Sequence, residues 1–229
     1  MATPYVFNFE AEVSSTQDLA RQHYAGRPVV WMAERQTDGR GRIGNAWLTA
    51  DEALAVSIAF EPQWPIEQLP VLSLVAGLSA TLALERRGAA GVHLKWPNDL
   101  LGERGKIGGI LAEVGGEIAV VGLGLNLYWP QAPDGMAGLW QSPPAPGFRK
   151  DLALGFVDDF LGRCSGDPRA WGLDEYRRRC LTIDREIVWQ PGGRGRAVDV
   201  GVDGALIVDS EGERHELRSG EVWEVRPAG

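Results

Sequence analysis

The stretch 95–113 gathers residues that could do chemistry: two lysines, an amide and a carboxylate, in the order Lys95, Asn98, Asp99 and Lys106. Lysine side chains can balance phosphate charge, and carboxylate oxygens are the ligands that Mg²⁺ prefers. The group could therefore bind a nucleoside triphosphate and its metal. The same side chains could instead be solvated charges in a turn, and the local sequence leaves both interpretations open.

A proline places this group at the end of a strand. Pro97 has no N–H for a ladder and favours an extended conformation at the preceding residue, so the strand-like run 92–94 should end there. Asn98 and Asp99 would follow in a turn. A glycine-bounded loop then leads to a second apolar run, 106–114, which Lys106 opens.

A second candidate group is a glycine-hinged loop, 37–45, that carries Arg40 and Arg42. Residues 39–44 formally match the G-x-G-x-x-G dinucleotide fingerprint, but no helical pattern follows and arginines fill the variable positions. Arginine's planar fork suits carboxylates and phosphates. The loop could fold over an anion, or it could be a solvated surface loop. With no ligand to neutralise the two arginines, we expect the loop to be mobile.

Hydroxyl and small residues mark two further stretches. Ser14-Ser15-Thr16 could cap a helix over 17–24, or hold a polar ligand group at its N-terminus. Gly122 and Gly124 permit close approach of a ligand to the backbone. Neither this pair nor Lys106 fits a Rossmann or phosphate-loop motif, because the required glycine and hydroxyl positions are missing.

Hydrophobic patterns predict the elements that carry these groups. Besides the runs named above, we expect strands at 5–9, 28–33, 54–60 and 117–122, with a hairpin turn at Gly115-Gly116. Helices are expected at 66–87, 150–163 and 169–179, and the proline-rich segment 128–147 should be irregular. Five short runs then follow between glycine-containing turns, at 187–190, 196–202, 205–210, 214–218 and 221–225. They predict a small β-barrel in which residues 193–196 lie at a hairpin turn.

Composition limits the class of protein. A net charge of −8 over 229 residues argues against a nucleic-acid-binding surface. Two cysteines are too few for a disulfide framework and fit a reducing compartment. The N-terminus lacks the pattern of a signal peptide, and the apolar segment 69–84 is interrupted and short for a membrane span. We expect a cytoplasmic protein that binds neither nucleic acid nor membrane.

Five stretches, in this order and at this spacing, resemble the biotin–protein ligase family: 14–17, 39–44 with Trp47, 95–99, 106–111 and 122–126. The C-terminal unit resembles the family's SH3-like barrel, so the resemblance covers essentially the whole chain. It implies an α+β fold, with a mixed-sheet catalytic domain of the biotin/lipoate ligase type at 1–180 and an SH3-like barrel at 181–229. The resemblance is to the biotin–[acetyl-CoA-carboxylase] ligases that lack a DNA-binding domain.

The resemblance also implies a reaction. Biotin and ATP would give biotinyl-5′-AMP with Mg²⁺ on the triphosphate, and a lysine of a biotin carboxyl carrier protein would then attack. Joining a carboxylate to a phosphate brings two anions together, so the site must supply cations. The resemblance assigns this catalytic role to Lys106, Arg40 and Arg42.

Ligand contacts carry over residue by residue. Biotin would contact Ser15, Thr16, Gln17, Gln36, Arg40, Gly41, Arg42, Lys106, Gly108 and Gly109. ATP would contact Arg42, Trp47, Lys95, Asn98, Asp99, Lys106 and Asn126. The sequence departs from the family pattern in two places: Gln17 stands where asparagine is frequent, and Asn45 where many members have another arginine.

Two other functions remain open at this point. A lipoate–protein ligase or octanoyltransferase could use the same scaffold, but the transferases need a catalytic cysteine, and Cys164 and Cys180 lie in the late helical region away from every motif. A non-enzymatic biotin-binding or sensing protein would not require Lys106 or the arginine loop. The scattered histidines suggest no protein-held metal. The sequence is compatible with a homodimer.

Overall fold

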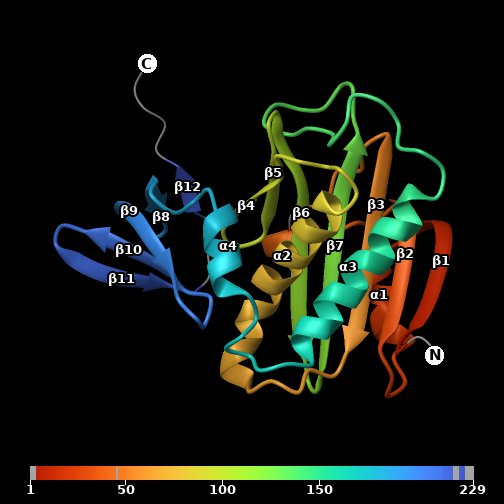
Figure 1. The fold of residues 1–229 in the computed structure, drawn as a ribbon, viewed down its shortest axis with the longest axis horizontal. Coiled ribbons are helices and arrows are strands. Elements are labelled where there is room, and N and C mark those ends of the chain that lie inside the picture. The colour runs from red at the N-terminus through yellow and green to blue at the C-terminus, as the bar shows by residue number, and fades with distance from the viewer. Residues whose placement is uncertain (1–3, 45, 219–221, 225–229) are drawn as a thin grey trace.

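A seven-stranded mixed sheet forms the main body of the protein (Figure 1). The computed structural model describes residues 4–44, 46–218 and 222–224. The strand order is β1-β2-β3-β7-β6-β5-β4, with β1 parallel to β2 and the other neighbours antiparallel. The strands are β1 (Val6–Val13), β2 (Val29–Gln36), β3 (Glu52–Phe60), β4 (His93–Lys95), β5 (Asp99–Gly102), β6 (Gly105–Gly115) and β7 (Ile118–Tyr128). The mixed sheet predicted for this part of the chain is confirmed.

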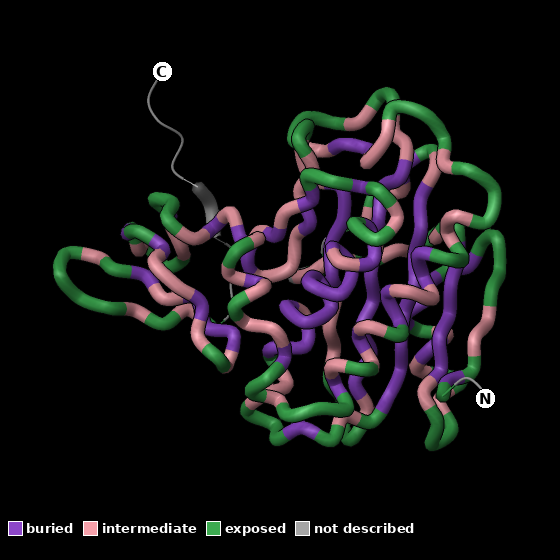
Figure 2. Tube along the Cα trace, viewed as in Figure 1, coloured by how far each residue is buried: buried purple, intermediate pink, exposed green. Residues whose placement is uncertain are grey.

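The two faces of this sheet have different covers. Alternate residues of β3, such as Leu54, Val56 and Ile58, enter the main core, where α2 (Leu72–Glu85) and α3 (Phe148–Cys164) pack. The opposite face carries α1 (Thr16–Gln22) over a smaller apolar cluster. Burial is accordingly concentrated in the central strands and α2 (Figure 2).

The 3₁₀ turn η2 (Ile66–Val71) runs directly into α2, which confirms the predicted long helical segment. Ile66–Glu85 has the length and composition of a membrane span, with a mean hydropathy of 1.4. However, 61% of its most apolar stretch is buried inside the protein, as expected for a core helix. Gly77 is used there for close packing, because a Cβ at this position would lie 3.1 Å from the side chain of Leu94.

The region around Pro97 differs from the prediction. Asp99 does not lie in a turn followed by a loop; it begins β5, a strand that the sequence analysis missed, and it pairs with Lys95 of β4 and Gly109 of β6. Lys95, Asp99 and the start of β6 therefore lie on three adjacent strands.

The C-terminal region forms a separate antiparallel sheet of five short strands, in the order β11-β10-β9-β8-β12. They are β8 (Glu186–Trp189), β9 (Gly193–Val200), β10 (Leu206–Ser210), β11 (Glu213–Leu217) and β12 (Val222–Glu224). All five predicted runs contain a strand, although the ends of the last run and its preceding turn lie outside the described residues. The boundary at 180/181 stays a prediction.

Three smaller predictions are wrong in position. Residues 193–196 lie within β9 rather than at a turn, and α4 (Leu173–Arg179) begins four residues later than expected. The β6–β7 turn falls at Gly116 and Glu117, because Gly115 pairs with Ile118. β7 continues to Tyr128, so Gly122, Gly124 and Asn126 belong to one strand.

The C-terminal sheet is attached to the strand that carries Lys95. The Leu181 amide donates to the Leu94 carbonyl at 2.8 Å, and Trp96 Nε1 donates to the Gly204 carbonyl at 2.9 Å. Trp171 Nε1 donates to the Val202 carbonyl at 3.1 Å. The first two contacts attach the residues before Pro97 to the C-terminal region.

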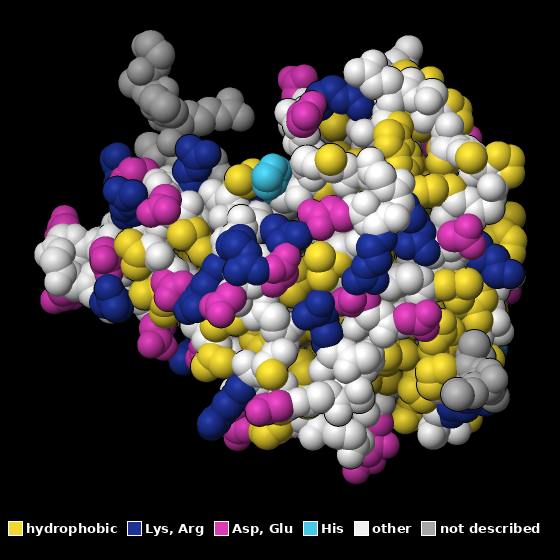
Figure 3. Space-filling model, in the orientation of Figure 1, with side chains coloured by type: hydrophobic (Ala, Val, Ile, Leu, Met, Phe, Trp, Pro, Cys, Tyr) yellow, Lys and Arg dark blue, Asp and Glu magenta, His cyan; other side chains and the backbone are white. Residues whose placement is uncertain are grey.

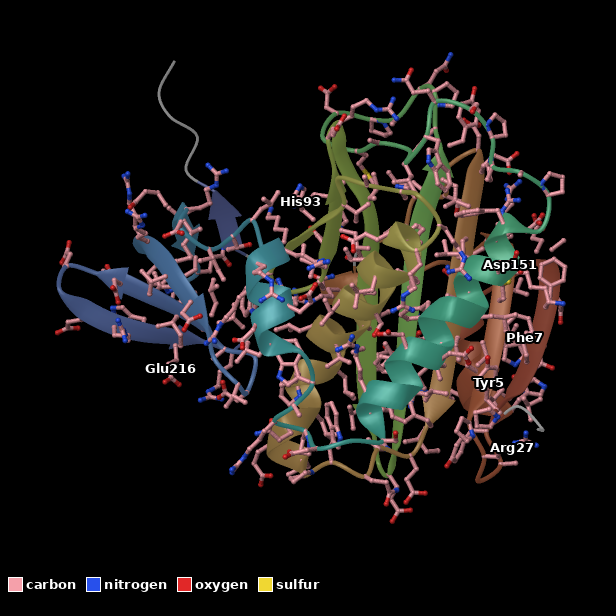
Figure 4. The ribbon with its side chains drawn as sticks, in the orientation of Figure 1. Tyr5, Phe7, Arg27, His93, Asp151 and Glu216 are labelled. Carbon is pink, nitrogen blue, oxygen red and sulfur yellow. The ribbon has the colours of Figure 1, made fainter. Side chains whose placement is uncertain are left out.

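Tyr5, labelled in Figure 4, lies at the opposite end of the main sheet. Its hydroxyl donates to Asp158 of α3 at 2.8 Å. Figure 3 shows the face that α2 and α3 cover, where Lys and Arg side chains are interspersed with Asp and Glu. A nucleic-acid-binding surface would be predominantly basic, and this face is not.

Candidate active site

A cavity of about 370 Å³ opens on the sheet face that carries α1. It brings together most of the residues predicted to bind ligand, although they come from six segments of the chain. Those that line it are Ser15, Thr16, Gln17, Gln36, Arg40, Gly41, Arg42, Trp47, Lys95, Asn98, Asp99, Lys106 and Gly109. Gly108 and Asn126 do not line it.

One end of the cavity is a chain of hydrogen-bonded polar groups. Thr16 Oγ1 lies 2.7 Å from Ser57 Oγ and 3.0 Å from Gln36 Oε1, and Ser57 Oγ donates to Gln17 Oε1 at 3.1 Å. The Thr16 amide also donates to Gln36 Oε1 at 2.8 Å. This end can offer both donors and acceptors to a polar ring. Ser57 was missed by the sequence analysis, although it is the one hydroxyl in the otherwise apolar core of β3 (Ala53–Phe60).

Gln17 is fixed by the backbone of β6 and β7. Its Nε2 donates to the Leu111 carbonyl at 3.2 Å and the Val120 carbonyl at 3.1 Å. The longer side chain found here in place of asparagine thus spans the distance from α1 to the sheet. Gly122 leaves room for the Gln17 side chain, because a Cβ at position 122 would lie 2.5 Å from Gln17 Oε1.

Lys106 lines the cavity. Its Nζ lies 2.6 Å from Asp99 Oδ1, and its side chain extends over Gly109. Its backbone is held by the segment 135–137, because its amide donates to the Gly135 carbonyl and its carbonyl accepts from the Ala137 amide, each at 2.9 Å. The ion pair with Asp99 therefore orients the ammonium group before any ligand binds.

The arginine loop closes one side of the cavity. Arg40 donates to the Asp18 carboxylate, and this bond raises the pKa of the Arg40 guanidinium above its ordinary value. Arg42 Nη1 donates to Asn98 Oδ1 at 3.1 Å. The expectation that nothing neutralises these arginines in the empty site is wrong for Arg40. Mobility of the loop stays a prediction, and Asn45 lies outside the described residues.

Trp47 packs on a pair of glycines. Gly109 and Gly124 are direct partners on β6 and β7, and a Cβ at either would lie 3.3 Å and 2.8 Å, respectively, from the indole. The Trp47 amide donates to the Gly39 carbonyl at 2.8 Å, which returns the loop to this surface. The indole therefore lies close to the sheet, where it could present an aromatic surface to a base.

The two predicted residues outside the lining lie close to it. A Cβ on Gly108 would meet Leu125 and the Gly124 carbonyl, so this glycine permits strand packing on the core side. Asn126 follows Gly122 and Gly124 at the strand period of two, so it shares their face. It is fully buried, and neither atom of its amide bonds to a described residue. Such a group is suited to a ligand, and its contact with ATP stays a prediction.

The cysteines are buried thiols. Burial raises the pKa of Cys164 to about 12, and burial also raises the pKa of Cys180. The expectation that both lie away from every motif is wrong for Cys180. Its backbone forms an isolated β-bridge with Leu94, directly before the motif that begins at Lys95. Neither thiol lines the cavity.

The described residues include no group of three or more His, Cys, Asp or Glu placed to hold a metal ion. The three histidines lie apart: His23 ends α1, His93 is in β4 (Figure 4) and His215 is in β11. Asp99 is the one carboxylate among the described residues that line the cavity.

Comparison with known proteins agrees with this geometry. Residues 10–126 match the model of the biotin/lipoate A/B protein ligase family. A biotin–[acetyl-CoA-carboxylase] ligase from Mycobacterium tuberculosis is 34% identical over 232 residues, covering 93% of this chain and 86% of the relative. This chain belongs to the biotin–protein ligase family. A second such ligase, from Paracoccus denitrificans, is 37% identical and covers 84% of this chain and 88% of its own length.

The family's fold extends over nearly the whole chain. The biotin protein ligase from Aquifex aeolicus, solved in complex with biotin and ATP, superposes with a TM-score of 0.83 at 26% identity. The match covers 97% of this chain and 99% of that protein, so both sheets have counterparts there.

Proposed function

We propose that this protein is a biotin–protein ligase, which converts biotin and ATP to biotinyl-5′-AMP and then biotinylates a lysine of a biotin carboxyl carrier protein. The combination of groups that line one cavity carries the proposal. The polar chain around Thr16 suits a ureido ring, Lys106 and the arginines suit the carboxylate and α-phosphate, and Trp47 suits a base. Family membership supports the same assignment.

In the first step, a biotin carboxylate oxygen attacks the α-phosphorus of ATP and pyrophosphate leaves. Negative charge accumulates on the α-phosphoryl oxygens as the bond forms. Lys106, held by Asp99 and by its backbone, would lie between the two anions and stabilise this charge without reorganising. Arg40 and Arg42 would add charge-assisted bonds from the loop.

In the second step, the carrier lysine amine attacks the carbonyl carbon of the mixed anhydride, and AMP leaves. The anhydride is already activated, so no protein nucleophile is required. The buried thiols, with Cys164 at a pKa of about 12, are consistent with this chemistry and not with a thiol-dependent transferase.

Magnesium would enter with the nucleotide. Mg²⁺ usually keeps several waters and takes one or two carboxylates together with substrate phosphates. The cavity fits that use, since Asp99 lines it and the described residues form no cage of protein ligands. Bound Mg²⁺ would neutralise charge on the triphosphate.

The test is incubation of the protein with ATP, Mg²⁺ and labelled biotin, lipoate or octanoate, followed by addition of a biotin carboxyl carrier domain. Of the three acids, we expect only biotin to give an adenylate and then a labelled carrier. Preferential activation of lipoate or octanoate would contradict the proposal in favour of the related ligases. Biotin binding without adenylate formation would indicate a sensing protein. The reaction would take place in the cytoplasm, where carboxylases and ATP are found.

A further inference from the structure

Asp18 forms an ion pair with Arg40, and no motif that carries the family resemblance includes this carboxylate. Asp18 lies in the first turn of α1, directly after the residues that form the polar end of the cavity. Arg40 lines the cavity, whereas Asp18 does not. The side chains are 43% and 52% exposed for Arg40 and Asp18, so solvent and ligand can reach the pair.

The backbone near Arg40 is already attached to the region before α1. The Thr37 amide donates to the Val13 carbonyl and the Asp38 amide to the Ser14 carbonyl, each at 2.9 Å. These bonds place the loop but leave the long Arg40 side chain free to rotate. The Asp18 carboxylate accepts a hydrogen bond from Nη2 of the guanidinium. Because guanidinium has five N–H donors in a fixed plane, the remaining donors stay available to a second anion.

We infer that Asp18 is a positioning residue that holds Arg40 at the cavity mouth before biotin binds. Its carboxylate orients the guanidinium plane, and the biotin carboxylate then meets an arginine whose side-chain freedom has already been lost. Asp18 acts through Arg40 and touches no reacting atom. The inference rests on the proposed function for the identity of the ligand.

A purely structural role for Asp18 must be separated from this one. An acidic residue in the first turn of a helix stabilises the helix through its dipole, whatever Arg40 does. That contribution would persist when Arg40 is absent, whereas positioning would not. A double-mutant cycle over Asp18 and Arg40 therefore distinguishes the two roles.

The chain offers a matched control in a second exposed ion pair, Arg35 with Glu12, at 3.3 Å with side chains 67% and 55% exposed. Neither residue lines the cavity. Glu12→Ala removes the same charge from a neighbouring strand, so it reports any general effect of net charge.

The experiment has two arms. Calorimetry measures the biotin Kd of wild type, Asp18→Ala, Arg40→Ala, the double variant and Glu12→Ala, without ATP. Hydrogen exchange of the free proteins measures amide protection over residues 39–44 and, separately, over 16–22. The second arm uses no ligand, so it remains valid even if wild type fails to bind biotin, a result that would overturn the proposed function instead.

We expect Asp18→Ala to weaken biotin binding about two- to fivefold, the size that a half-exposed ion pair supports. In the Arg40→Ala background, Asp18→Ala should raise the biotin Kd by less than a further 1.5-fold. The biotin Kd of Glu12→Ala should match that of wild type. Asp18→Ala should also speed exchange over 39–44 only when Arg40 is present. Equal effects of Asp18→Ala in both backgrounds, or faster exchange confined to 16–22, would overturn the inference. If Arg40→Ala binds biotin too weakly to measure, the exchange arm decides alone.

Discussion

Lys106 Nζ and Asp99 Oδ1 lie 2.6 Å apart, at the starts of β6 and β5. The side chains are 31% and 22% exposed, so the pair is only partly solvated. Asp99 is in turn paired in the ladder with Lys95 and Gly109. The carboxylate thus keeps the ammonium over Gly109 while the site is empty, and it remains close by when substrate phosphate arrives.

Asp99→Asn should slow formation of biotinyl-AMP tenfold or more, because the neutral amide no longer holds Lys106 or meets the metal on the triphosphate. Quenched single-turnover assays measure the rate of biotinyl-AMP formation. Asp134→Asn removes the same charge from an exposed position in the neighbouring segment and should leave the rate unchanged. Equal rates for wild type and Asp99→Asn would show that the pair has no part in activation.

Gly122→Ala should impair biotin binding specifically. The added methyl would lie 2.5 Å from Gln17 Oε1 and 3.1 Å from Ser57 Oγ, so the polar chain must shift. We expect at least a tenfold higher KM for biotin and little change in KM for ATP. In the control Gly162→Ala, the methyl in α3 meets nothing within 4 Å and should stabilise the helix by up to about 1 kcal/mol. An unchanged biotin KM in Gly122→Ala would contradict the placement of the polar end.

Trp96→Phe and Trp171→Phe form a matched pair. Each removes an indole N–H that donates to a carbonyl of the C-terminal region, Gly204 or Val202. The bond to Gly204 is buried, so its carbonyl would be left unpaired at a cost of about 1–3 kcal/mol, whereas Val202 is exposed and the loss there should be smaller. The melting temperature should fall in both variants. Only Trp96→Phe should also raise KM for ATP, because Trp96 belongs to the turn that carries Asn98. A similar KM effect in both would mean that the contact to Gly204 does not position the nucleotide side.

Replacing both cysteines by alanine should preserve carrier biotinylation at near wild-type rate. Both thiols are buried and outside the cavity, and alanine avoids placing a hydroxyl in the core. The melting temperature should fall modestly from lost packing. Loss of transfer with adenylate formation intact would instead support a thiol-dependent mechanism.

Much of the site could be predicted because its signals are local. Pro97 ends β4, Ser15 caps α1 by accepting from the Asp18 amide, and glycines mark close backbone approach. These features depend on a few neighbouring residues, so pattern reasoning recovers them. The resemblance to a known family then supplied roles for the residues that the patterns had identified.

The features that were missed depend on distant partners. β5 is four residues long and is stabilised by pairing with β4 and β6, so its own sequence carries little strand signal. Ser57 gains its role from α1, and Asp18 from an arginine 22 residues later. The link from Trp96 to Gly204 spans 108 residues. Such relationships exist only after the chain has folded.

The central claim, that Lys106 is the cation joining biotin's carboxylate to the α-phosphate, is tested most directly by the rate of biotinyl-AMP formation in Lys106→Ala. The charge contact strengthens as the transition state forms, so we expect a loss of several powers of ten. Lys106→Arg should not recover fully, because the wider guanidinium cannot replace a compact ammonium over Gly109. Lys95→Ala should lose less, and all three variants should melt close to wild type. A Lys106→Ala protein that melts like wild type and forms biotinyl-AMP at a comparable rate would contradict the account.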